Sequence, residues 1–250
     1  MDFNFRKPTH ILALILVFFT FLVFIIIPII SYFGIPPSVQ TDQIDNISDS
    51  IRPLFGIIFL FIQLVIVVAL FILVPILWYH FVNRVNLKQM LSNLKLRKNG
   101  IDKAILWGTI TMIFAFVIII AIGVVMIYMG FDPNESSNIP ELESYFSLPL
   151  MLILITFQPI GEEIFFRGFL LEKINSIMGN EAAIIITALL FGIAHLSFGN
   201  VYPAFMTAVV GLLLAFLIIK TKNLYSAITA HILFNLVSFS FYIISKTIQI

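Results

Sequence analysis

A small set of polar side chains in the second half of this 250-residue chain lies inside otherwise apolar stretches. The set consists of Glu162, Glu163, Arg167, His195, His231 and Asn235. An ionisable group inside a membrane-spanning segment is energetically costly, so each such residue is a candidate for function. The first half of the chain has no comparable set, which places the chemistry in the second half.

The spacing of these residues groups them into clusters. Three pairs have the separation of four that puts two side chains on one helix face, namely Glu163 with Arg167, Phe191 with His195, and His231 with Asn235. Glu162 points about 100° away from Glu163 around the helix axis and has no obvious partner on its own helix. Three clusters on three helices predict one convergent site.

Elimination narrows the chemistry of that site. No serine stands in a Gly-x-Ser turn, the aspartates fall in loops, no His-Glu-x-x-His sequence occurs, and the chain has no cysteine. A glutamate, two histidines and an asparagine remain. A carboxylate in an apolar setting is an effective base, and histidine and asparagine can donate hydrogen bonds to a developing oxyanion. These residue types suit water-mediated hydrolysis of an amide bond.

Three short motifs resemble those of a known family. Glu162–Gly168 reads EEIFFRG and matches EExxxR, Phe191–His195 reads FGIAH and matches FxxxH, and His231–Asn235 reads HILFN and matches HxxxN. In this order, inside apolar helices, they resemble the CPBP intramembrane protease family, which includes the CAAX prenyl endopeptidases. The resemblance covers roughly residues 145–240, and residues 1–140 carry no motif that we assign.

The resemblance implies a role for each matched position. It implies that Glu162 activates the hydrolytic water with help from His195, and that His231 and Asn235 form the oxyanion site. The implied orienting groups are Glu163, Arg167 and Phe191. Members of the family were long described as metalloproteases but look more like glutamate-type endopeptidases. We therefore expect no cofactor, although Glu162, His195 and His231 are ligand types that could hold one zinc ion.

Other interpretations remain open at this point. The same fold could serve without proteolysis, as a bacteriocin immunity protein or a scaffold for another membrane protein. A small transporter or proton channel could use Glu162, His195 and His231 as a relay. Each polar residue taken alone could also be structural, since Glu163 and Arg167 can neutralise each other and Asn235 can bond a neighbouring helix.

The composition indicates that this chain is surrounded mostly by lipid rather than by water. Hydrophobic residues make up 60% and charged residues 11%, with a mean hydropathy of +1.09, which excludes a water-soluble globular protein. The net charge of +1 argues against a nucleic-acid-binding protein. The absence of cysteine excludes disulfides and thiolate metal sites.

Long apolar runs predict an all-α polytopic membrane protein with about seven transmembrane helices and the catalytic core in the last four. The predicted spans are about 10–33, 54–82, 104–130, 146–161 continuing into the charged segment 162–178, 182–198, 201–219 and 224–244. Segments 162–178 and 182–198 should form a helical hairpin about Gly179. We expect residues 1–140 to be a scaffold of three spans, in which Gln63 bonds a neighbouring helix, and residues 141–250 to be the protease core.

The basic residues predict the orientation. Twelve of the 14 Lys and Arg fall in alternate segments: the N-terminus, the 84–103 loop, and the turns after the fourth and sixth spans. We therefore expect a cytoplasmic N-terminus, with a catalytic cavity facing the cytoplasm and, in a prokaryote, a location in the cell membrane. The expected partners are the lipid bilayer and a membrane-associated peptide or protein substrate, which a CAAX-like activity would make prenylated. The 84–103 loop could also touch anionic lipid headgroups.

Overall fold

The computed structural model describes residues 3–34, 52–130, 146–196 and 201–248, and all regular elements in these ranges are helical. In chain order they are α1 (Pro8–Phe21), η1 (Leu22–Ile26), α2 (Ile27–Gly34), α4 (Arg52–Val67), η2 (Val68–Leu73), α5 (Val74–Phe81), α6 (Leu87–Asn93), α7 (Ile101–Tyr128), α9 (Leu148–Glu163), η4 (Ile164–Leu170), α10 (Leu171–Ile193), α11 (Val201–Thr221) and α12 (Leu224–Ile248). The η elements are π-helical turns that continue the α-helices around them.

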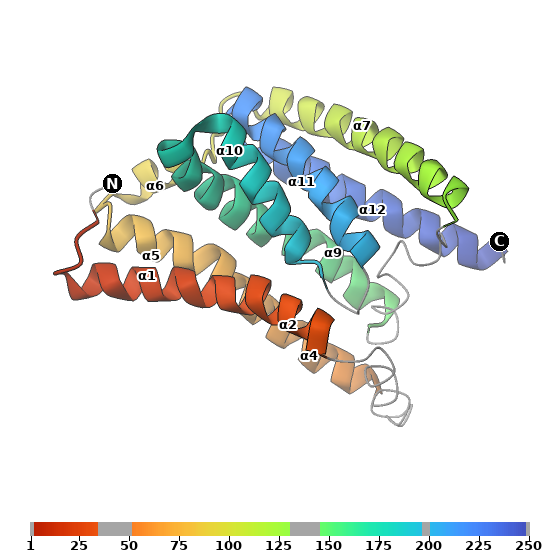
Figure 1. Ribbon diagram of the computed structural model, residues 1–250, viewed down its shortest axis with the longest axis horizontal. Helices are drawn as coiled ribbons and strands as arrows, with labels where there is room; N and C mark the ends of the chain where they lie inside the picture. Colours follow the sequence, from red (N-terminus) through yellow and green to blue (C-terminus); the bar gives the residue numbers. More distant parts are fainter. Residues whose placement is uncertain (1–2, 35–51, 131–145, 197–200, 249–250) are drawn as a thin grey trace.

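Within the described residues, six continuous helical stretches are long and apolar enough to cross a membrane. The stretch Leu148–Ile193 has 46 residues. It reverses direction at Gly179, where φ is 82° and ψ is 173° (Figure 1). Glycine tolerates this backbone because it lacks a Cβ. The stretch therefore supplies two spans, and the prediction of an all-α polytopic membrane protein with a hairpin about Gly179 is confirmed.

The N-terminal helices pack on one side of the α9–α10 hairpin. α1 lies against α5, and α4 lies against α9. Aromatic rings fill the junction, because Phe71 of η2 lies 4.1 Å from Phe24 and 5.3 Å from Phe165 of η4, measured between ring centroids. Gln63 donates from Nε2 to Gln158 of α9 at 3.4 Å, as predicted for a polar residue that bonds a neighbouring helix. These contacts attach the first two spans to the segment that carries Glu162.

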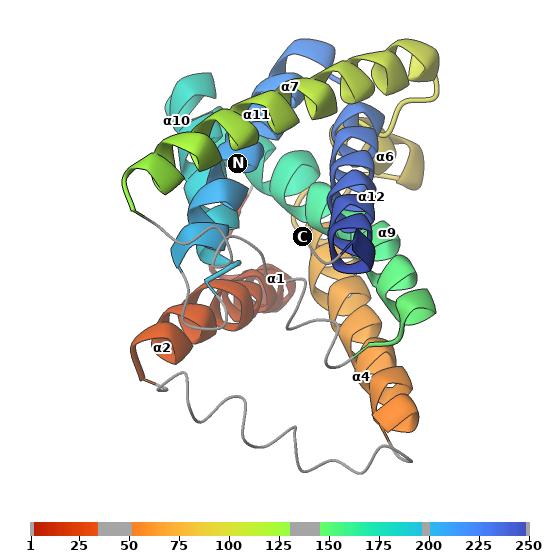
Figure 2. The same ribbon diagram turned by 90° about the vertical axis from the view of Figure 1, so that its right-hand side faces the viewer.

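The third span lies on the opposite side of the hairpin. α7 crosses α12 and α11 (Figure 2). Gly108 permits close approach, since a Cβ at this position would lie 2.5 Å from the carbonyl oxygen of Ser226 in α12. By sequence α7 belongs to the expected scaffold, yet it packs on the predicted core. The boundary near residue 140 therefore stays a prediction.

The basic segments lie at one end of the molecule. α6, the Gly179 bend, the beginning of α7 and the turn between α11 and α12 are together there, and the ends of α2, α7 and α12 lie at the other (Figure 1). Arg167 is an exception to the predicted distribution of basic residues, because its side chain is fully buried in η4 rather than placed in a turn. The remaining charges at this basic end fit one common side of a membrane.

Candidate active site

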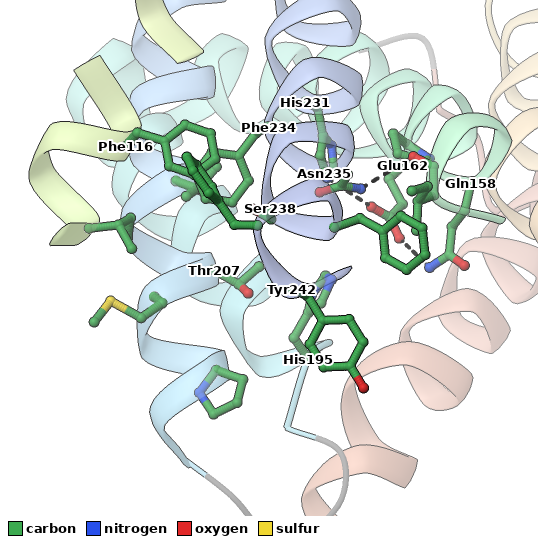
Figure 3. Close-up of a pocket in the computed structure, with 18 of the residues that line it drawn as sticks. Phe116, Gln158, Glu162, His195, Thr207, His231, Phe234, Asn235, Ser238 and Tyr242 are labelled. Atoms are coloured by element: carbon green, nitrogen blue, oxygen red, sulfur yellow. Dashed lines mark hydrogen bonds and ion pairs between the residues drawn. The ribbon is translucent and has the colours of Figure 1, made fainter. Parts of the chain in front are cut away.

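The four residues predicted to be catalytic line one cavity of about 680 Å³. Glu162 lies at the end of α9 and His195 in the turn after α10, whereas His231 and Asn235 both lie in α12 (Figure 3). Apolar and aromatic side chains of α7, α9, α11 and α12 form most of the wall. Packing of α9, α10 and α12 thus brings together residues that are up to 73 positions apart in the sequence.

A buried ion pair between Glu163 and Arg167 lies next to the cavity residues. Arg167 Nη1 donates to Glu163 Oε1 at 2.9 Å, and both side chains are fully buried. Arg167 Nη2 donates to the carbonyl oxygen of Gly211 in α11 at 3.3 Å. The guanidinium carbon lies 4.0 Å from the centroid of the Phe191 ring. The predicted pairing is confirmed, and it ties η4 to both α10 and α11.

The π-helical geometry of η4 coincides with this pair. η4 begins at Ile164, directly after Glu163, and its residues are all buried. One extra residue per turn changes which side chains point inward, and π-helical turns occur often at functional sites. Pro159 precedes η4 inside α9 and leaves the backbone there without one hydrogen-bond donor. The motif therefore lies in a locally irregular helix.

His231 lies between the two glutamates. Its Nδ1 is 2.9 Å from Glu163 Oε1, and its Nε2 is 3.7 Å from Glu162 Oε2. The second separation exceeds a hydrogen bond, which leaves Nε2 available to a third group beside Glu162. The sequence predicted His231 as an oxyanion donor but did not predict its contact with Glu163, since that contact joins residues 68 positions apart.

Glu162 does have a partner on its own helix, contrary to the sequence interpretation. Gln158 Nε2 donates to Glu162 Oε1 at 2.7 Å, and Gln158 also lines the cavity (Figure 3). Gln158 and Glu162 are four residues apart, so the spacing that identified the Glu163 pair was also the signal for this one. The bond between Gln63 and Gln158 extends the chain of hydrogen bonds from the Glu162 carboxylate into α4.

His195 lies just beyond the end of α10 rather than inside a helix. α10 ends at Ile193, whereas the sequence predicted a span over 182–198. The last two residues of that prediction, 197 and 198, lie outside the described residues. His195 Nδ1 is 2.8 Å from the carbonyl oxygen of Phe191. A carbonyl oxygen only accepts, so Nδ1 carries the proton. In a neutral ring the other nitrogen, Nε2, then keeps a lone pair that can accept a proton.

Asn235 and Phe191 complete the polar region. Asn235 Nδ2 donates to the carbonyl oxygen of Ile155 in α9 at 3.4 Å, a long bond that holds the amide at the cavity wall. The buried Phe191 ring lies 4.8 Å from the His195 ring and 5.7 Å from the His231 ring, between centroids. Phe191 thus packs against both imidazole rings.

The zinc site considered from the sequence stays a prediction. Among the described residues, no three histidine, aspartate or glutamate side chains converge in a way that could hold a metal ion. His231 directs Nδ1 at Glu163, and Nδ1 of His195 is engaged with its own helix end. These bonds orient both imidazoles through Nδ1 and leave Nε2 of each ring facing the cavity, so they do not bear on metal binding, and no step below uses a metal.

The cavity extends away from the basic end. Its lining runs from His231 to Ser245 along α12, from Tyr202 to Val210 along α11, and from Met151 to Glu162 along α9. Each stretch leads to the end of the molecule opposite the basic turns (Figure 1). The sequence placed both the basic turns and the cavity opening on the cytoplasmic side, and both placements stay predictions. With the basic turns in the cytoplasm, the described lining leads to the other side.

Comparison with known proteins identifies what the core resembles. Residues 144–237 match the family described as type II CAAX prenyl endopeptidase Rce1-like. The putative membrane peptidase YdiL of Bacillus subtilis (strain 168) is 28% identical over 236 residues, covering 92% of this chain and 87% of that protein. No solved structure matches the chain. The family resemblance indicated by the three motifs is confirmed.

Proposed function

We propose that this integral membrane protein, whose residues 144–237 match the Rce1-like family of type II CAAX prenyl endopeptidases, is an intramembrane endopeptidase of the glutamate type. The observation that carries the proposal is the shared cavity of Glu162, His195, His231 and Asn235. In this cavity Glu162 and His195 can hold a water molecule. His231 and Asn235 can donate hydrogen bonds to the substrate carbonyl that the water attacks.

Charge balance suggests the resting state. With both buried carboxyl groups ionised, Glu162 and Glu163 are balanced by two positive charges. Arg167 supplies one through its bond to Glu163. A doubly protonated His231 supplies the second, with Nδ1–H donating to Glu163 and Nε2–H directed beside Glu162. This state places a charged donor next to the catalytic carboxylate without leaving a net charge in the apolar core.

Hydrolysis then follows from these positions. A water held between the Glu162 carboxylate and the lone pair on His195 Nε2 loses a proton to Glu162 as its oxygen attacks the substrate carbonyl carbon. His231 Nε2–H and the Asn235 amide stabilise the negative charge that develops on the carbonyl oxygen. Glu162 returns the proton to the leaving amine as the carbon–nitrogen bond breaks. Gln158 holds the carboxylate at the required angle throughout.

The distribution of basic residues suggests from which side of the membrane a substrate reaches the cavity. We place the N-terminus and the basic turns in the cytoplasm because these segments are together at one end of the molecule. The described cavity lining then leads to the non-cytoplasmic half of the membrane. The proposed substrate is a membrane-associated peptide or protein segment that reaches Glu162 from that half. A cytoplasmic prenylated tail fits this direction less well.

Loss of the Glu162 carboxylate tests the proposal. Purified protein in detergent is incubated with peptides pooled from a membrane fraction, and new termini are identified by mass spectrometry. We expect Glu162→Gln and His195→Ala to lower cleavage by roughly 10²–10⁴-fold, the usual contribution of general acid–base groups. Glu181→Gln, which changes an exposed glutamate of α10, is the matched control and should retain full activity.

Three outcomes would contradict the proposal. Full activity of both site variants would reject the assigned residues. Cleavage that stops with a chelator and returns with zinc would favour the metal version instead. Proton or solute flux in liposomes that disappears with Glu162→Gln, without any cleavage, would favour the relay interpretation.

A further inference from the structure

A second cavity, of about 930 Å³, lies between α7 and α11 at the basic end of the molecule. It shares no lining residue with the cavity of Glu162. Both cavities touch α7 and α11 but at different heights, since this one uses the beginning of α7 and the end of α11. It is therefore a separate site, and its existence does not depend on the proposed peptidase activity.

The walls of this cavity are apolar and face outward. They are formed by one face of each helix, with Trp107, Ile110 and Phe114 on α7 and Leu213, Phe216 and Leu217 on α11. Trp107, Phe114 and Phe216 are each half exposed or more, at 53%, 56% and 50%. In a membrane protein such a groove opens to hydrocarbon, and tryptophan favours the boundary between hydrocarbon and headgroups.

The rim of the cavity is cationic. Its charged lining residues are Arg97, Lys103, Lys220 and Lys222, and no aspartate or glutamate lines it among the described residues. Within that part of the chain, none of the four is ion-paired with a carboxylate. Asp102 stands beside Lys103 in the sequence but is not part of the lining. Four cations around one opening repel each other, and an anion between them removes that cost.

Hydrogen bonds hold the two parts of the rim together. Asn223 Nδ2 donates to the carbonyl oxygens of Arg97 and Asn99, at 3.0 Å and 3.4 Å. The amide of Leu224 donates to the carbonyl oxygen of Lys95 at 2.8 Å. These bonds join the loop before α7 to the turn after α11, so they bring cations from sequence positions more than 100 apart into the lining of one cavity.

We propose that this groove binds one anionic phospholipid. The basic rim holds the headgroup phosphate, and an acyl chain lies along the aromatic walls formed by Trp107, Phe114 and Phe216. Charge complementarity selects an anion, and the apolar outward-facing wall selects a lipid over a soluble phosphate. With the basic end in the cytoplasm, as proposed above, the location fits because the cytoplasmic leaflet carries the anionic lipids.

The test measures retention of single lipids. Detergent-purified protein is titrated with phosphatidylglycerol or phosphatidylcholine, and bound lipid is counted by native mass spectrometry. The variant Arg97→Gln/Lys220→Gln should bind phosphatidylglycerol about 25-fold more weakly, because each cation contributes a factor of about five to the affinity. The control Lys88→Gln/Lys98→Gln removes two exposed cations that do not line the cavity, one in α6 and one just before α7, and its affinity should stay within about twofold of wild type.

Further arms distinguish a lipid site from other sources of binding. Phe216→Ala should weaken the binding of phosphatidylglycerol. Glycerol phosphate at the same concentration should not compete with the lipid for the site. Equal affinity for phosphatidylcholine would overturn the proposal, as would effective competition by glycerol phosphate, which indicates a free-phosphate site. Equal losses in the control pair would also overturn it, because they indicate diffuse attraction. In wild-type protein, a photoreactive phosphatidylglycerol should crosslink to residues 103–114 or 213–222, and crosslinks confined elsewhere would refute the site.

Discussion

Removing the guanidinium of Arg167 should destabilise the protein more than any exposed charge change. Arg167 and Glu163 are both fully buried, with 2.9 Å between Nη1 and Oε1. Replacing Arg167 by methionine leaves the Glu163 carboxylate in the core with only His231 as a partner. Breaking a buried pair from one side costs about 3–5 kcal/mol, because the desolvated charge that remains loses its strongest partner. We expect Arg167→Met to lower the free energy of unfolding by that amount.

The chain provides a reporter for this measurement. Trp78 is 7% exposed, and its ring lies 5.9 Å from the Phe169 ring, two residues beyond Arg167. The other tryptophan, Trp107, can be replaced by phenylalanine to give a single reporter. Equilibrium unfolding in mixed micelles, followed by Trp78 fluorescence, then gives the free energy of unfolding for each variant.

Lys173 offers the matched control. Its Nζ lies 3.1 Å from Glu172 Oε2, but these side chains are 14% and 34% exposed rather than fully buried. Its ammonium also lies 4.5 Å from the Tyr79 ring centroid. Lys173→Met should therefore cost only about 1 kcal/mol. An Arg167→Met cost no larger than this control would refute the role of burial.

A double-mutant cycle separates the pair from the packing around it. If the cost of Arg167→Met comes from the stranded carboxylate, then adding Glu163→Gln should restore part of the stability. We expect the double variant to be more stable than the sum of the single changes by about 1–3 kcal/mol. Additive losses would show that lost packing against Phe191, rather than charge, dominates.

Two further predictions concern the hydrogen bond to Glu162 and the orientation of the chain in the membrane. Gln158→Leu removes the donor 2.7 Å from Glu162 Oε1, so kcat should fall about 10–100-fold while KM and the unfolding midpoint change little. A proportional loss of stability would instead indicate a structural role. Because the chain has no cysteine, Ser245→Cys and Lys222→Cys each introduce one thiol for labelling. In right-side-out vesicles an impermeant maleimide should label position 245 and not 222, and the reverse result would invert the proposed orientation.

Helix periodicity and hydropathy determine much of this protein locally. Apolar runs of about 20 residues define the spans, because a helix of that length crosses the hydrocarbon core and makes all its backbone hydrogen bonds within one segment. The Glu163–Arg167 pair follows from a separation of four on one helix. The hairpin follows from Gly179, which takes a backbone angle that other residues avoid. The Gln158–Glu162 bond was accessible to the same reasoning.

Only the tertiary structure decided how these local features meet. The position of His231 between Glu162 and Glu163 depends on how α12 packs against α9 and η4. The end of α10 before His195, the direction of the main cavity, and the basic groove between α7 and α11 are likewise properties of packed helices. Spacing along one helix fixes only the angle and rise of a side chain. The approach of two helices depends instead on volumes and small residues such as Gly108, which act across distant parts of the chain.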